Sequence, residues 1–182
     1  MPQLWMTRMS LFDTAADLEV DLLATAHEDS VRLFNALVYQ NDEELTDSHP
    51  LVRMWQGYHV AVGAYNAALA ATMAQHRISF GTRALKVAGV VRQMRGDAPD
   101  PFVMPPWVED ADVLRSHRSN IVRRWPEYDG VWPKTPERMP YLWPFVDGEG
   151  GYELYLSKYD KEQLAAGERA LPDSIKKRIV NL

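Results

Sequence analysis

The stretch DVLRSHRSNIVRRWPEYDGVWPKTPERMPYLWP, Asp112 to Pro144, combines one histidine, five arginines, three tryptophans and two tyrosines. It contains few simple aliphatic residues, although these suffice to build a helical core. Guanidinium groups hold phosphates, and aromatic rings stack on nucleobases. The stretch therefore favours a nucleic-acid surface. An equally supported alternative is that its aromatic residues cover a small helical core while its arginines lie in solvent.

Hydrophobic residues on both sides of this stretch recur at helical spacing. We expect helices at about 13–39, 50–76, 82–95 and 109–124, with a proline-rich loop before Trp107. After Pro144, a short strand or extended arm and two short helices are expected. The sequence thus predicts a mainly α protein. We expect a compact single-domain helical bundle (residues 1–146) with a short C-terminal appendage (residues 147–182).

One face of the predicted helix at 50–76 carries His59, Gly63, Asn66 and Ala70 at spacings of three and four. The small residues would let another backbone or a ligand approach the two polar side chains. The alternative is a tight crossing of two helices in which the polar groups are satisfied.

Composition excludes several classes of protein. The 182 residues include no cysteine, which excludes disulfides, thiolate metal sites and cysteine nucleophiles and suits a cytoplasmic protein. A formal net charge of −5 gives no global basic field, but basic residues cluster in 77–95 and 115–138. The start of the chain lacks a signal-peptide pattern, and its least polar run is too polar for a membrane span. We therefore expect no membrane partner. The oligomeric state stays open.

The sequence contains no metal-binding histidine pair, phosphate-binding glycine loop or nucleophile elbow, so we expect neither a metal nor a cofactor. Two other features suggest chemistry. Removal of the initiator methionine would expose the amine of Pro2, which can attack an electrophilic sugar carbon. His117, Arg118, Ser119 and Asn120 place an acid–base group, a guanidinium and two small polar groups within one helical turn. We expect this helix to bind an anion, the alternative being a solvated basic face.

Two segments resemble a known family. HPLVRMWQGYHVAVGAYNAALA, from His49, and PPWVEDADVLRSHRSNIVRRWPEYDGVWP with MPYLWP, from Pro105 to Pro144, are similar to segments of bacterial and phage pyrimidine-dimer DNA glycosylase-like proteins, the endonuclease V excision family. The resemblance spans about residues 13–144 in the same order. It implies an all-α fold that binds DNA across its surface and displaces one nucleotide from the stack.

The family's chemistry implies roles for single positions in this chain. The mature N-terminal amine attacks the sugar C1′ with help from a carboxylate on the first helix, so the resemblance gives these roles to Pro2 and to Asp29, with Glu28 as the alternative carboxylate. Relatives often have LGKQRVE where this chain has LATAHED, so His27 replaces a basic residue and Asp29 a glutamate. His59 stands at an often acidic position. Because these basic residues are missing, the first helix differs from the pattern that the family uses to excise a lesion.

Three functions therefore stay open. The first is a pyrimidine-specific DNA glycosylase and AP lyase acting on a flipped nucleotide. The second is a transferase on the same scaffold that attaches an amine or amino acid to an activated hydroxymethyl-uracil in DNA. The third is a DNA-binding protein without catalysis.

The candidate residues form three groups. Catalytic candidates are Pro2, His27, Asp29, His59 and His117. Candidates for binding DNA phosphates are Arg53, Arg115, Arg118, Ser119, Asn120, Arg123, Arg124 and Tyr128, the last expected to be exposed on a turn. Candidates for base stacking are Trp55, Trp107 and Trp132. We expect the groups around His117 to face an extruded nucleotide.

Overall fold

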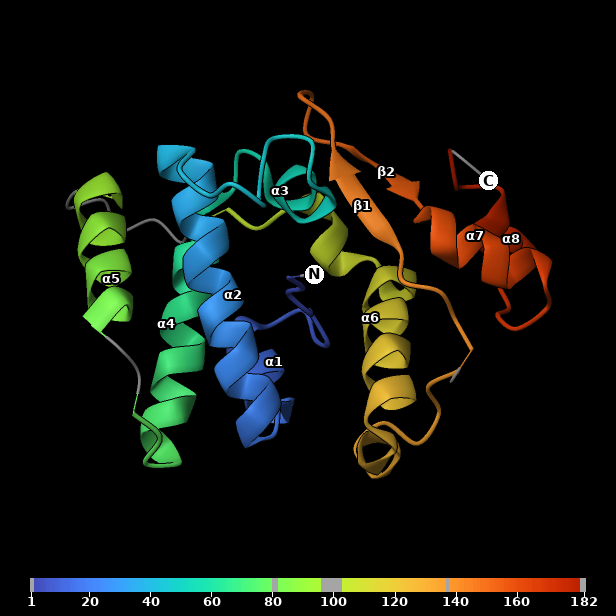
Figure 1. Cartoon of the computed structure of the whole chain (residues 1–182), viewed down its shortest axis with the longest axis horizontal. Helices are drawn as coiled ribbons and strands as arrows, with labels where there is room; N and C mark the ends of the chain where they lie inside the picture. Colours follow the sequence, from blue (N-terminus) through green and yellow to red (C-terminus); the bar gives the residue numbers. More distant parts are fainter. Residues whose placement is uncertain (1, 80–81, 96–102, 137, 181–182) are drawn as a thin grey trace. The chain divides into compact units, whose positions relative to one another are not determined.

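A computed structural model of the chain describes residues 2–79, 82–95, 103–136 and 138–180, and of 82–85 and 93–95 only the backbone (Figure 1). Its contacts divide the chain into two compact units. Unit 1 comprises Met1–Leu4 and Ser10–Pro105, and unit 2 comprises Trp5–Met9 and Pro106–Leu182. Within the described residues the only sheet has two strands, so the predicted mainly α fold class is confirmed.

Unit 1 is helical, with elements α1 (Leu11–Asp17), α2 (Val20–Tyr39), α3 (Pro50–Trp55), α4 (His59–Gln75) and α5 (Thr82–Arg95). Two expected helices are each split in two. Leu18 and Glu19 have extended backbones between α1 and α2. Gly57, with a φ of 83°, lies between α3 and α4 in a conformation that most other residues avoid. The expectation of continuous helices at 13–39 and 50–76 is therefore wrong at these breaks.

The centre of unit 1 is a close packing of α2 and α5 against α4, and Figure 1 shows these helices side by side. A Cβ atom at Gly63 would overlap Val91 Cγ2 and lie 3.3 Å from Phe34 Cε2. Asn66 Nδ2 donates a hydrogen bond of 2.9 Å to Ser30 Oγ in the same interior. The face with His59, Gly63 and Asn66 is therefore a tight helix crossing with satisfied polar groups.

Gly63→Ala should destabilise the protein by about 1–3 kcal/mol, because the added methyl group overpacks a filled crossing. Gly89→Ala is the matched control, since Gly89 lies on the exposed side of α5 with nothing within 4 Å of an added Cβ atom. There the better helix propensity of alanine should stabilise by up to about 1 kcal/mol. Urea unfolding measures both changes. Equal effects of the two substitutions would contradict the tight crossing.

Unit 2 contains η1 (Pro106–Glu109), α6 (Ala111–Arg124), η2 (Pro126–Gly130), β1 (Trp143–Val146), β2 (Tyr152–Tyr155), α7 (Lys158–Ala165) and α8 (Asp173–Lys176). The predicted helix at 109–124, the strand near 152 and the two short terminal helices are confirmed. The strand β1, which pairs antiparallel with β2, was not expected. The turn between them forms because the Asp147 carboxylate accepts hydrogen bonds from the Glu149 and Gly151 N–H groups.

Residues after 146 bind the start of α6 through a hydrogen bond and an ion pair. The Asp110 carboxylate caps this helix by accepting from the Asp112 N–H at 2.9 Å. It also accepts a 2.6 Å hydrogen bond from the Tyr152 hydroxyl and forms an ion pair with Arg178. The contacts thus group residues 147–182 with α6 in unit 2. A domain boundary between residues 146 and 147 stays a prediction.

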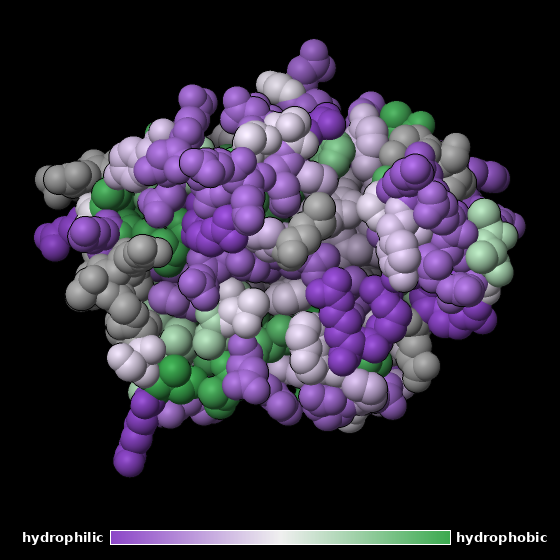
Figure 2. Space-filling view, in the orientation of Figure 1, coloured by the Kyte–Doolittle hydropathy of each residue, from purple (hydrophilic) through white to green (hydrophobic). Residues whose placement is uncertain are grey.

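The surface is mostly polar on the face drawn in Figure 2, where hydrophilic residues predominate and hydrophobic residues form smaller areas. Among the described residues, no helix has the length and hydropathy needed to cross a membrane.

Candidate functional site

His117 lies in the core of unit 2 and not on its surface. Its ring is fully buried and stacks on Tyr141, with ring centroids 4.4 Å apart and planes inclined by 9°. Its Nδ1 accepts a 3.0 Å hydrogen bond from the Met6 N–H. Close by in sequence, Asn120 Oδ1 accepts from Trp5 Nε1 at 3.2 Å. The expectation that His117 and Asn120 contact a nucleotide is therefore corrected, because His117 Nδ1 and Asn120 Oδ1 accept hydrogen bonds inside the protein.

The polar face of α6 holds a proline-braced loop. Ser119 Oγ accepts a 3.1 Å hydrogen bond from the Met139 N–H and donates one of 3.1 Å to the Met139 carbonyl. Ser116 Oγ accepts from the Leu142 N–H at 3.2 Å and donates to the Val113 carbonyl at 2.8 Å. A loop with prolines has few backbone partners of its own, and buried backbone groups must be paired. The two serines on α6 supply those partners.

The aromatic candidates are also interior. Tyr128, expected to be exposed, is 1% exposed and stacks on Trp132 with centroids 5.2 Å apart. Trp107 is fully buried, and Trp132 is 5% exposed. In unit 1, Trp55 is fully buried beside Tyr65, with centroids 6.4 Å apart. A nucleobase cannot reach these rings in this structure, because neighbouring side chains already cover them. The expectation that Trp55, Trp107 and Trp132 stack on bases is therefore corrected.

The arginine candidates of α6 are only partly accessible. Arg115 forms an ion pair with Asp112 at 3.3 Å, and Arg118 Nη1 donates to the Thr7 carbonyl at 3.4 Å. Arg123 is half-buried and donates to the Met139 carbonyl at 3.4 Å, while Arg124 is exposed. In unit 1, Arg53 is half-buried in the last turn of α3. Phosphate binding by these five arginines stays a prediction.

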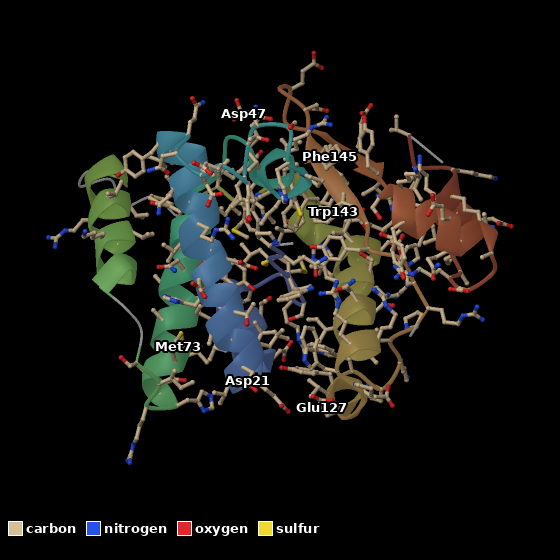
Figure 3. The ribbon with its side chains drawn as sticks, in the orientation of Figure 1. Asp21, Asp47, Met73, Glu127, Trp143 and Phe145 are labelled. Carbon is tan, nitrogen blue, oxygen red and sulfur yellow. The ribbon has the colours of Figure 1, made fainter. Side chains whose placement is uncertain are left out.

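Figure 3 labels two aromatic residues of β1 in unit 2, Trp143 and Phe145. The Trp143 ring continues the stack from His117, because it lies 4.5 Å from the Tyr141 ring. Phe145 stacks on Tyr155 of β2 at 4.5 Å. Tyr141 and Trp143, two of the aromatic residues that suggested a nucleic-acid surface, therefore pack in the interior with His117, as the alternative of a covered core expected.

Acid should destabilise the protein through His117. Burial lowers the pKa of its ring to about 3, although the neighbouring backbone groups of Leu142 and Met6 oppose this shift. The unfolded chain takes up a proton below about pH 6.5, whereas the folded ring stays neutral. Stability from this group is therefore complete above pH 6.5 and falls by about 1.4 kcal/mol per pH unit as pH drops towards 3.

Chemical denaturation of wild type and of His117→Gln at about pH 7 and about pH 4.5 measures this effect. Between these two pH values, the free energy of unfolding should fall by about 2–3 kcal/mol more in wild type than in the variant. His76→Gln is the control, since His76 is exposed at the end of α4 and should leave the slope unchanged. Should His117→Gln fail to fold, proton NMR of the wild-type ring gives the same answer. A ring that titrates near pH 6.5 would contradict the buried, neutral histidine.

The second candidate region lies in unit 1, where the N-terminal segment meets α2. The Gln3 N–H donates a 2.9 Å hydrogen bond to Asp29 Oδ2. Asp29 is half-buried, and burial raises the pKa of its carboxyl, while the Gln3 hydrogen bond and the charge of Arg32 oppose this shift. Pro2 directly precedes Gln3, and adjacent Cα atoms are about 3.8 Å apart. Pro2 therefore lies one residue from the backbone N–H that binds Asp29, the other residue named from the sequence.

The other catalytic candidates of unit 1 are less suited to chemistry. His27 is buried on α2, and burial lowers the pKa of its ring while Glu28 opposes this shift. Its carbonyl accepts a 2.7 Å hydrogen bond from Ser30 Oγ. His59 is half-buried at the first position of α4.

Sequence reasoning missed Arg32, whose charge acts on Asp29, and His49, on which Arg32 also acts. Arg32 lies one helical turn after Asp29 and pairs with Asp42 at 3.0 Å and with Glu44 at 2.9 Å. The i,i+3 spacing from Asp29 was the signal that could have identified it. His49 caps α3 by accepting from the Leu51 N–H at 3.1 Å. Burial lowers the pKa of His49, and the charge of Arg32 lowers it further.

Comparisons of the chain with protein-family models, with curated proteins and with solved structures find no match. Within the described residues, no group of three or more histidine, aspartate or glutamate side chains is placed to hold a metal ion. The function therefore has to be argued from the geometry of the chain itself, and the resemblance seen in the sequence enters only as a proposal.

Proposed function

We propose that the protein is a pyrimidine-specific DNA glycosylase and AP lyase whose nucleophile is the amine of Pro2. The observation that supports this most directly is the hydrogen bond from the Gln3 N–H to Asp29. It places a half-buried carboxylate next to the residue that becomes the N-terminus once Met1 is removed. The resemblance to pyrimidine-dimer glycosylase-like proteins assigns the same two positions to the amine and the carboxylate.

The chemistry proposed for this pair is covalent catalysis. A terminal amine has an ordinary pKa near 8, so a useful fraction is unprotonated at neutral pH. Its nitrogen forms a bond to the sugar C1′ while the bond from C1′ to the base breaks and the base leaves with that electron pair. Asp29 accepts the proton lost by the amine and offsets the positive charge that develops on the sugar. The proton held by Asp29 then passes to the sugar O4′ as the C1′–O4′ bond breaks, the departed base takes a proton from water, and the opened sugar is joined to Pro2 by an iminium at C1′.

DNA binding is the second part of the proposal. The stacking platform expected around His117 is buried and plays no part in it. Partly exposed arginines remain as contacts to the phosphate backbone, and Arg124 is the most accessible of them on α6. Such contacts position DNA without reading its sequence, and they weaken as salt rises. The preference for a pyrimidine rests on the sequence resemblance.

Borohydride trapping on duplex DNA containing an abasic site tests the nucleophile. Wild type with its initiator methionine removed, as verified by mass spectrometry, should give a covalent adduct, and a chain extended before Pro2 should give none. Asp29→Asn keeps an oxygen that can accept from Gln3 and should slow adduct formation by about 10²-fold or more. Asp21→Asn is the matched control, because Asp21 is exposed on α2 (Figure 3) and should react like wild type.

The same assay separates the two other functions left open by the sequence. A transferase acting on a modified pyrimidine should change the mass of the DNA without cleaving the strand, whatever precedes Pro2. A DNA-binding protein without catalysis should do neither, yet lose affinity as salt rises. An adduct that survives extension of the N-terminus would contradict the assignment of Pro2.

A further inference from the structure

Unit 2 contains a cavity of about 270 Å³ that opens to solvent beside the C-terminal half of α6. It is lined by Val122, Arg123, Pro126, Asp129, Arg138 and Glu168, which come from α6, η2, the proline-braced loop and the turn after α7. None of these residues takes part in the proposed chemistry at Pro2 and Asp29. The lining contains two cations, two anions and two apolar residues.

The first cation, Arg123, is poorly compensated. Its guanidinium is half-buried and makes one long hydrogen bond to the Met139 carbonyl, and within the described residues it forms no ion pair. Burial lowers the pKa of Arg123, and the neighbouring charges of Arg169 and Arg124 lower it further. A guanidinium has five N–H donors, so most of them remain available. A site of this kind favours an anionic group.

The nearest buried carboxylate cannot neutralise Arg123, because it already has partners. Asp160 forms a buried ion pair with Arg169 and accepts a 2.6 Å hydrogen bond from Ser157 Oγ. Its charge opposes the shift at Arg123 but ranks behind the effect of Arg169. The interior next to the cavity therefore keeps an excess of positive charge.

The second cation, Arg138, is held in place by backbone groups. Its Nε donates to the Glu168 carbonyl at 2.9 Å, and its Nη2 donates to the Gly167 carbonyl. Gly167 has a φ of 74°, which lets the turn present these two carbonyls. Neither hydrogen bond uses Nη1, so this nitrogen can still bind a ligand.

The two anions of the lining lie on its exposed part. The side chains of Asp129 and Glu168 are exposed and form no ion pair or hydrogen bond with other described residues. Both signs of charge thus line one small cavity without neutralising each other. Surface pairs that only stabilise the fold would instead be in contact.

We infer that this cavity binds a small zwitterion, namely a free α-amino acid. Its carboxylate would bind Arg123 and Arg138, and its ammonium group would face Glu168 and Asp129. Val122 and Pro126 provide an apolar surface for its side chain. The volume supports a ligand of this size, because pockets for drug-sized molecules begin at about 300 Å³. Charge-assisted hydrogen bonds to both ends would distinguish an amino acid from a simple acid or amine.

Thermal unfolding of the full chain in the presence of each common L-α-amino acid tests this site, because a ligand that binds only the folded state raises the unfolding temperature. The amino acid that stabilises most is then compared with its analogue lacking the amine, with its analogue lacking the carboxylate, and with inorganic phosphate. Only the zwitterion should stabilise. Calorimetry should show at least about tenfold weaker binding for Arg123→Gln and for Glu168→Gln.

Lys134→Gln is the matched control, because Lys134 is an exposed cation of unit 2 that does not line the cavity. It should bind like wild type. Equal stabilisation by the analogue lacking the amine or by phosphate would contradict the zwitterion proposal and indicate a site for anions. Absence of any response, or binding that persists in Arg123→Gln, would overturn the site itself. A chain extended before Pro2 should bind the amino acid unchanged, so failure here is distinguishable from failure of the proposed glycosylase.

Discussion

The hydrogen bonds between α6 and the loop around residues 139–142 are the constraint on which unit 2 depends. That loop contains prolines and cannot form a regular ladder, yet Met139, Tyr141 and Leu142 are buried in it. Buried backbone groups without partners each cost about 1–3 kcal/mol. Ser116 and Ser119 supply partners from one face of the helix. The buried side of the helix therefore carries apolar residues, such as Val113 and Ile121, together with polar residues that bind the loop.

The burial of polar groups on α6 explains why the sequence was informative about the fold and misleading about the site. Helical periodicity located α5, α6 and the terminal helices because apolar spacing depends on neighbouring residues only. It could not detect the break at Gly57, since apolar residues continue in phase on both sides. It also gave no sign that His117 and Asn120 were interior. Their partners are Met6 and Trp5, more than 100 residues away in the chain.

The region at Pro2 shows the opposite case. A proline after the initiator methionine is a local feature, and the carboxylate at Asp29 was named through a resemblance in register. Their proximity depends on a contact between Gln3 and α2 that no local pattern encodes. Arg32 was also missed. The charge of Arg32 acts directly on Asp29, and the ion pairs of Arg32 with Asp42 and Glu44 exist only when the loop after α2 is folded.

The division of the chain into units has a consequence for its synthesis on the ribosome. Trp5–Met9 belongs to unit 2, whose other residues begin only at Pro106. The Met6 N–H and the Trp5 indole therefore have no partners until His117 and Asn120 have been translated. Domains usually complete their folding in order from the N-terminus. Here unit 2 needs residues that are translated before most of unit 1, so its core stays incomplete until synthesis has passed α6.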